Sequence, residues 1–108
     1  MAFYLFQGSY THDALKALLK QPANRTDVVR KAVEELGGSL QGAWYAFGEY
    51  DAVLIVELPD NVSAAALSLA VAAGGAIQGG KTTPLMTMDE GLAAFKKAGT
   101  SNYRAPGK

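Results

Sequence analysis

The chain has 108 residues, the size of one typical domain, and its ten basic residues balance its ten acidic ones to a formal charge of zero. No stripe of Lys and Arg runs along any segment, so the electrostatic footprint of a nucleic-acid-binding protein is missing. The absence of cysteine excludes disulfides and thiolate chemistry, and a single histidine gives no basis for a zinc site. We expect no nucleic-acid partner, no metal and no cofactor.

The amino terminus lacks the basic start, apolar stretch and cleavage site of a secretory signal. The longest uncharged stretch, residues 61–80, has an apolar part shorter than the roughly 20 residues that a membrane span needs. That stretch predicts a buried helix that runs into a strand. We therefore expect a cytoplasmic protein with no membrane partner.

Strand and helix signals alternate through the first third of the chain. Residues 2–10 predict an aromatic-rich strand, after which Thr11 is a helix N-cap. The short helix after this cap is interrupted at Gln21-Pro22, and a second helix runs from about Arg25 to Gly37-Gly38, whose glycines stop it. The two helices form one crossover with a break.

A β-hairpin is predicted around Gly48-Glu49-Tyr50-Asp51, because this turn lies between the apolar runs 40–47 and 52–58. Glycine at the first central position supplies the positive φ of a primed two-residue turn. With Gly48-Glu49 as the loop, the residues paired across the strands are Phe47 with Tyr50, Ala46 with Asp51, Trp44 with Val53, and Leu40 with Glu57. One face of the hairpin is then an apolar lining with a carboxylate at each end, formed by Trp44, Asp51, Val53, Ile55 and Glu57.

The second crossover is an alanine-rich helix that the Asp60-Asn61 pair caps and Gly74-Gly75 closes. Residues 77–86 predict the last strand. Pro84 within it cannot donate a ladder hydrogen bond, which requires an edge position or a local break.

A terminal helix begins at Thr87, whose spacing to Glu90 is that of a capping box. Leu92 and Phe95 are expected to point inward, and Gly99 ends the helix. We expect one domain over residues 1–99 and a flexible polar tail over residues 100–108.

The order β-α-β-β-α-β plus a terminal helix predicts an α+β, ferredoxin-like fold with a four-stranded antiparallel sheet. The strands are apolar on both faces, whereas this fold places both main helices on one face. A bare apolar sheet face predicts a second copy packed against it, and hence a homodimer or an assembly of dimers.

The turn resembles that of the GYD-domain family, named for the glycine, tyrosine and aspartate that stand here as Gly48, Tyr50 and Asp51. The resemblance covers residues 3 to about 98 and includes Tyr10-Thr11, Arg25, Gly37-Gly38 and Glu57-Leu58-Pro59-Asp60. It implies a dimeric α+β barrel of largely uncharacterised function. The last strand departs from the family pattern, because Pro84 interrupts a strand that is continuous there.

Candidate functional residues lie on the apolar face and near its ends. The expected ligand-binding residues are Tyr10, Trp44, Tyr50, Asp51 and Glu57. The catalytic candidates are Asp51 and His12, the latter because a helix N-terminus favours a neutral imidazole that acts as a general base. Structural alternatives exist: Asp51 locks the turn by accepting backbone N–H bonds, Glu57 pairs with a base such as Arg25 or Lys81, and His12 is a solvent-exposed helix residue. Tyr10 and Trp44 are, in the same way, core aromatics.

Three functions stay open. A homo-oligomeric module binds a small organic molecule in an apolar, aromatic-lined cavity. A cofactor-independent enzyme transfers a proton on a small hydrophobic substrate through Asp51 or His12. A structural or regulatory assembly subunit has no pocket and uses Asp51 only to hold its turn. A ligand retained by the purified protein separates the first two from the third.

Overall fold

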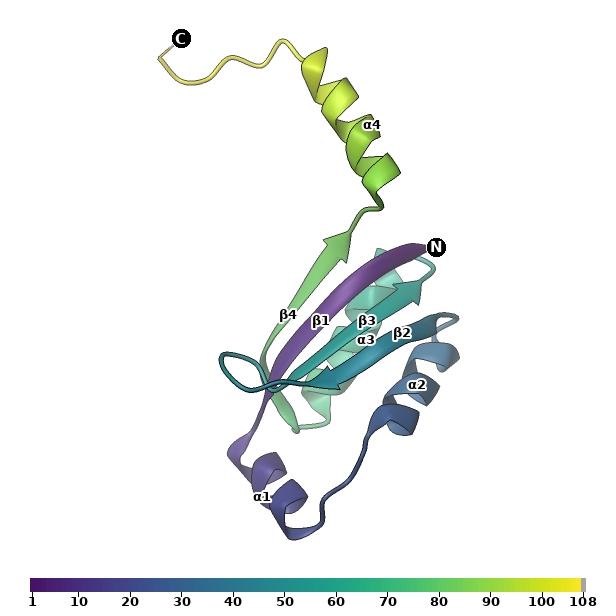
Figure 1. Ribbon diagram of the computed structural model, residues 1–108, viewed down its shortest axis with the longest axis vertical. Helices are drawn as coiled ribbons and strands as arrows, with labels where there is room; N and C mark the ends of the chain where they lie inside the picture. The colour runs from purple at the N-terminus through teal and green to yellow at the C-terminus, as the bar shows by residue number, and fades with distance from the viewer. Residues whose placement is uncertain (108) are drawn as a thin grey trace.

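Four strands and four helices make up the computed structural model, which describes residues 1–107 (Figure 1). In chain order the elements are β1 (Ala2–Tyr10), α1 (His12–Lys20), α2 (Thr26–Glu35), β2 (Ser39–Tyr45), β3 (Ala52–Leu58), α3 (Asn61–Ala73), β4 (Ile77–Leu85) and α4 (Met88–Gly99). Residues 100–107 of the predicted tail form neither helix nor strand, and Lys108 lies outside the described residues.

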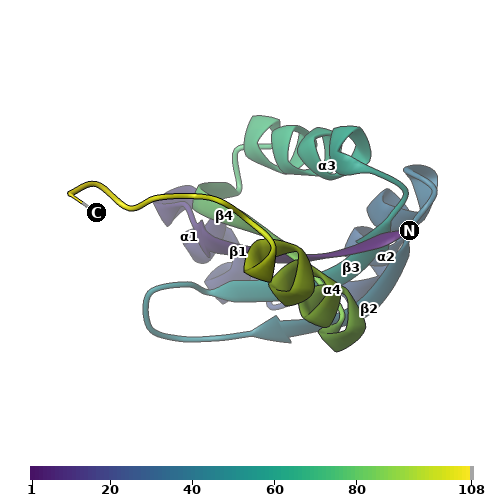
Figure 2. The same ribbon diagram turned by 90° about the horizontal axis from the view of Figure 1, so that it is seen from above.

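The strands form one antiparallel sheet in the order β2-β3-β1-β4. The element order and the antiparallel pairing are those predicted for a ferredoxin-like α+β fold. Figure 2 shows α3 above the sheet, and no described helix covers the opposite face. α4 continues beyond the end of β4 and away from the sheet (Figure 1).

Three predicted N-caps are confirmed. The hydroxyl of Thr11 accepts the Ala14 N–H at 3.2 Å, and the carboxylate of Asp60 accepts the Ser63 N–H at 2.8 Å. Thr87 and Glu90 form the reciprocal bonds of a capping box. Short polar side chains fit these positions because the first N–H groups of a helix have no partner within it. The bonds from Ser63 hold the pKa of Asp60 below its ordinary value.

The core lies between α2, α3 and one face of the sheet, toward the start of β1. Its fully buried residues are Tyr4, Val33, Val56, Leu58, Ala64 and Leu67. The Tyr4 hydroxyl donates a hydrogen bond to Asn61 Oδ1 at 2.7 Å, so the phenol buries its ring without leaving its polar atom unpaired.

The hairpin loop is wider than the predicted two residues. β2 ends at Tyr45 and β3 begins at Ala52. Gly48 has the expected positive φ, at 140°. Trp44 pairs with Val53 as predicted, but the register does not extend to a pair between Phe47 and Tyr50. The Ala46 N–H still donates to the Asp51 carbonyl at 2.8 Å, which closes the loop.

A register shift in β2 overturns the predicted pairing of Leu40 with Glu57. One extra residue, Gln41, lies between the pairs Leu40–Val56 and Gly42–Ile55. Leu40 therefore packs against the core, and Ser39 takes the place opposite Glu57. The alternation of apolar residues did not reveal the bulge. One extra residue moves every earlier residue of the strand to the opposite face of the sheet.

β4 is an edge strand, as the proline within it required. Pro84 pairs with Tyr4 of β1, and the other edge of β4 has no described neighbour in the sheet. The register shifts between Gln7 and Ser9, at the point where β4 supplies Gly79-Gly80. The irregularity thus lies at the glycines and not at the proline.

The expectation that Leu92 and Phe95 point inward is wrong. Their exposed fractions are 50% and 77%, and α4 has no buried residue. The helix has the predicted apolar spacing, but it leaves the body of the subunit, so no part of the described chain covers it (Figure 1).

The expectation that α3 is a buried helix holds for only one side of it. Ala64 and Leu67 are buried against the sheet, whereas Val62 and Leu69 are exposed on the outer side. Among the described residues, no helix has the length and apolar character that crossing a membrane requires.

Candidate functional site

The helix-free face of the sheet carries the side chains that alternate with the core residues along each strand. It consists of Phe3, Leu5, Gln7, Trp44, Val53, Ile55, Glu57, Lys81, Thr83 and Leu85. Most of these side chains are apolar and only half-buried. The face is therefore both hydrophobic and uncovered within the described chain, as the strand composition predicted.

An aromatic cleft of about 240 Å³ lies on the other side of the sheet, where the chain passes from α1 to α2. Gln21-Pro22 ends α1, so residues 21–25 cross the ends of the strands without forming a helix. No helix then packs over this end of the sheet, and the cleft stays open. It is lined by Tyr10, Ala23, Asn24, Arg25, Thr26, Val29, Ala43, Trp44, Tyr45, Ala52 and Leu54.

Two tyrosines from different strands meet in the aromatic cleft. The ring centroids of Tyr10 and Tyr45 are 6.4 Å apart, with the rings tilted by 49°, within the range of favourable aromatic pairs. The Tyr45 hydroxyl donates a hydrogen bond to the Ala23 carbonyl at 3.0 Å. This bond ties the connection before α2 to the sheet and fixes one wall of the cleft.

The phenol of Tyr10 has an unusual electrostatic setting. Burial and the neighbouring Tyr45 raise the pKa of Tyr10, and Asp51 adds to this effect while Arg25 opposes it. Three polar side chains from separate parts of the chain, Tyr45, Arg25 and Asp51, thus act on the phenol of Tyr10. The proton of Tyr10 is held more tightly than that of a solvent-exposed tyrosine.

Asp51 holds the turn to the end of β1. Its carboxylate accepts the Tyr10 N–H at 2.9 Å, and its own N–H donates to the Gly8 carbonyl at 2.9 Å. These bonds continue the β1–β3 ladder past its last paired residue, Ala52. They are the backbone contacts that the structural account of Asp51 predicted. Asp51 also lines a hollow of about 260 Å³ against α1, which shares Tyr10, Ala23 and Tyr45 with the aromatic cleft.

Trp44 borders both surfaces, since it lines the aromatic cleft and its ring belongs to the helix-free face. A Cβ atom at position 42 would collide with the indole ring. Gly42 therefore lets the ring lie back along β2, and 55% of Trp44 remains exposed.

The structure does not bring all the predicted site residues together. Tyr10, Trp44 and Asp51 gather at the loop end of the sheet, together with Tyr45, which the sequence did not single out. Glu57 lies at the other end of the helix-free face, opposite Phe3. Tyr50 is half-buried in the loop, and His12 is exposed at the start of α1. None of these three lines the aromatic cleft or the hollow against α1.

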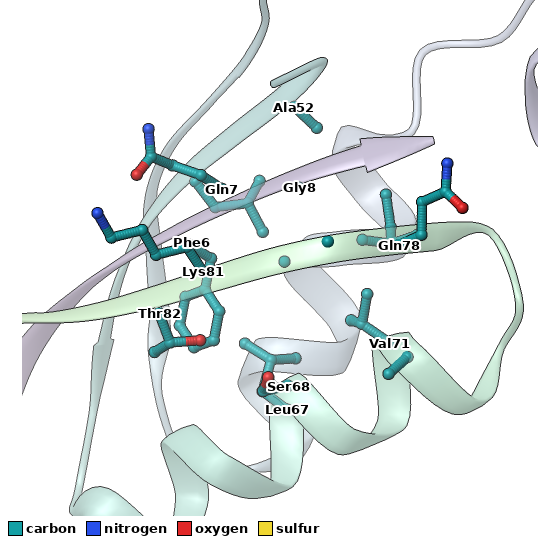
Figure 3. A pocket seen from close by; sticks show the side chains of 15 residues that line it. Phe6, Gln7, Gly8, Ala52, Leu67, Ser68, Val71, Gln78, Lys81 and Thr82 are labelled. Atoms are coloured by element: carbon teal, nitrogen blue, oxygen red, sulfur yellow. The ribbon is translucent and has the colours of Figure 1, made fainter. Parts of the chain in front are cut away.

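The predicted ion pairs of Glu57 with Arg25 or Lys81 are not formed. Over residues 1–107 the one ion pair joins Arg30 to Asp27 at 2.7 Å. Arg25 instead borders the aromatic cleft, and Lys81 points away from α3 on the helix-free face (Figure 3). The sequence suggested both cations as possible partners of Glu57, but their spacing along the chain does not indicate how far from Glu57 they lie in the fold.

A further hollow of about 260 Å³ lies between α3 and strands β1 and β4 (Figure 3). Phe6 and Thr82 point from the sheet toward α3, and Leu67, Ser68 and Val71 face them. Small residues in the lining leave this space unfilled, namely Ala52, Ala72, Gly79 and Gly80, whereas Ile77 occupies the place of a side chain at Gly8. This hollow was not predicted from the sequence. The feature that could have indicated it is the set of small residues on the strands and on α3.

The GYD domain family matches residues 4–95 of the chain. No curated protein matches it. Among solved structures, the crystal structure of FFRP-DM1 is similar at 15% sequence identity, with 80% of this chain and 100% of that chain covered and a TM-score of 0.49. Because the family match spans most of the sequence, the chain belongs to the GYD domain family.

Proposed function

We propose that the protein is a homo-oligomeric module that binds one small organic molecule in the aromatic cleft of each subunit. The observation that carries the proposal is the Tyr10–Tyr45 pair, with ring centroids 6.4 Å apart at the wall of an open cleft. Aromatic walls with a few convergent polar groups are typical of small-molecule sites. Here the polar groups are the Tyr10 hydroxyl, Thr26 and Arg25.

The chemistry of the cleft favours a compact ring that carries an acidic group. Its volume of about 240 Å³ is below the roughly 300–1,000 Å³ of sites for drug-sized ligands, so the ligand is smaller than those. Arg25 has no ion-pair partner among residues 1–107, and its guanidinium is free to receive a carboxylate. Tyr10 and Tyr45 offer rings on which a planar ligand ring packs.

The helix-free face supports the homo-oligomeric part of the proposal. Packing two such faces together about a two-fold axis buries the apolar side chains of both subunits and forms a dimeric α+β barrel. In this arrangement residues 1–99 are the functional domain, and residues 100–108 are a tail. We also propose a cytoplasmic location, which suits a chain without cysteine.

Native mass spectrometry of gently purified protein tests the proposal, because it reports subunit number and retained small molecules together. We expect an oligomer that carries extra mass. Tyr45→Ala should lose that mass, whereas Tyr103→Ala, in the exposed C-terminal segment, should keep it. If the purified protein carries no extra mass, benzoate is the first probe to titrate. Failure of wild-type protein to retain a compound and to bind aromatic carboxylates such as benzoate would refute the binding module.

A second candidate function is proton transfer to a small hydrophobic substrate. The position of Tyr10 favours it, because its phenol lines the cleft and its raised pKa keeps it protonated, so that it can donate a hydrogen bond to an oxygen atom of the substrate. Of the two residues that the sequence suggested, Asp51 already accepts the Tyr10 N–H, and His12 lies outside the cleft. Turnover of the retained compound that Tyr10→Phe abolishes, with binding kept, would establish an enzymatic function. Equal binding and no turnover in either protein would reject it.

A further inference from the structure

We propose that α4 of each subunit is a docking arm that packs on the part of a second copy's helix-free face that the opposing sheet leaves open. The inference rests on the proposed homodimer and extends it, since it assigns a role to an element outside the sheet. Its starting point is an apolar stripe on α4 that has no partner within the subunit.

The α4 stripe consists of Met88, Leu92 and Phe95, whose exposed fractions are 92%, 50% and 77%. Their spacing of four and then three residues places them on one side of the helix. Small residues, Gly91 and Ala98, flank the stripe on one side and allow a close approach. A surface helix that faces only water does not need such a stripe.

The arm is held away from its own sheet by its short connection. Two residues, Met86 and Thr87, separate β4 from α4. The capping-box bonds of Thr87, at 2.8 and 3.0 Å, set the direction in which the helix begins. The radius of gyration is consequently 17.3 Å, whereas a compact domain of this length has about 13 Å.

The area of the helix-free face is too small to form a stable dimer alone. Four strands about 4.8 Å apart and about seven residues long give a face of roughly 400 Å², or roughly 800 Å² for two subunits. A standard protein interface buries about 1,600 Å² in total. A 12-residue helix is about 18 Å long and about 10 Å wide, so two arms add roughly 400 Å² of their own surface. The arms raise the total to roughly 1,200 Å², the lower end of the range for stable interfaces.

The charges of the two surfaces are complementary. The helix-free face carries one acid and one base, Glu57 and Lys81, and neither has an ion-pair partner among residues 1–107. α4 likewise has one of each sign beside its stripe, Asp89 and Lys96, seven residues apart on the same side of the helix. A second copy thus offers each surface an apolar area and, for each of its unpaired charges, a charge of opposite sign, which favours self-association.

Site-specific photocrosslinking in the full-length chain tests the contact. p-Benzoylphenylalanine replaces Phe95 in the stripe or, as the matched control, Lys97 on the opposite side of α4. Mixed 15N-labelled and unlabelled subunits separate crosslinks between chains from those within one chain. We expect the position 95 probe to give crosslinked dimers through residues 2–10, 39–45 or 52–58 of the other copy, and the position 97 probe to give few. Crosslinks within one chain, or only to α4 of the other copy, would overturn the inference.

Analytical ultracentrifugation distinguishes this inference from the dimer on which it rests. Phe95→Ser should raise the dissociation constant of the dimer at least tenfold, while Lys97→Ser changes it less than twofold. Neither variant should affect folding of the sheet, because α4 has no buried residue. A wild-type dimer that Phe95→Ser leaves unchanged refutes the docking arm alone. A wild-type monomer at all concentrations refutes both the arm and the sheet-to-sheet dimer.

Discussion

Tyr4 and Tyr10 lie on the same strand and the same side of the sheet, yet their surroundings are opposite. Tyr4 is 2% exposed beneath α3, and its hydroxyl is bound to Asn61. Tyr10 lies where the α1–α2 connection leaves a cleft, and its hydroxyl meets other polar side chains. The two tyrosines differ in exposure because α3 covers Tyr4, whereas no described helix covers Tyr10. One end of β1 contributes to stability, and the other end is available for binding.

The largest expected effect tests the end of the sheet that α3 covers. Leu67→Ala removes a fully buried side chain, and we expect the free energy of unfolding to fall by about 2–5 kcal/mol in denaturant titrations. Leu69→Ala is the matched control on the same helix, because Leu69 is 70% exposed, and its cost should be below about 0.5 kcal/mol. Similar losses in the two variants would mean that the outer side of α3 is covered as well.

An intermediate effect is expected at Asp51, where the hairpin turn meets the end of β1 beside the aromatic cleft. Asp51→Ala leaves the Tyr10 N–H without its acceptor and should cost roughly 1–2 kcal/mol in the same measurement. Asp51→Asn should cost less, since the amide oxygen can accept the bond, and Glu49→Ala in the exposed loop should cost almost nothing. If Asp51→Ala is as stable as wild type but loses the retained ligand, Asp51 is a binding residue and not a structural one.

The smallest expected effect concerns the titration of Tyr10. Its pKa is raised in the folded chain, so the folded state holds this proton more tightly than the unfolded state does. Stability should therefore fall as the pH rises above about 10, the ordinary tyrosine value, toward the raised folded-state pKa. Tyr10→Phe should remove this part of the pH dependence and one tyrosinate from the absorbance titration. An unchanged titration curve in that variant would contradict the electrostatic description of the cleft.

The parts of the fold that were predicted correctly depend on neighbouring residues. Thr11, Asp60 and Thr87 act as caps because a helix begins directly after each of them and presents its free N–H groups within three positions. The bulge at Gln41 and the outward course of α4 depend instead on contacts with distant parts of the chain. Local periodicity therefore placed Leu40 and Phe95 on the wrong surfaces.

The candidate site was predicted only in part, for the same reason. Tyr10, Trp44 and Asp51 were chosen for their chemistry, and the structure places them near one another. Tyr45 and Arg25 join them because the break after α1 brings residues 23–26 over the strand ends. The spacing of these residues along the chain does not predict that residues 23–26 lie over the strand ends. Glu57 was grouped with the others by alternation alone, which fixes a face but not a position along it.

Gly42 and Trp44 together give the protein an internal spectroscopic reporter. Trp44 is the only tryptophan of the chain, and the glycine lets its indole lie on the helix-free face beside the aromatic cleft. Its fluorescence is consequently sensitive to the polarity of both surfaces. Association would exclude water from the helix-free face, and a ligand would fill the cleft. A blue shift on raising the protein concentration would report the first event, and quenching at fixed concentration the second, without any added label.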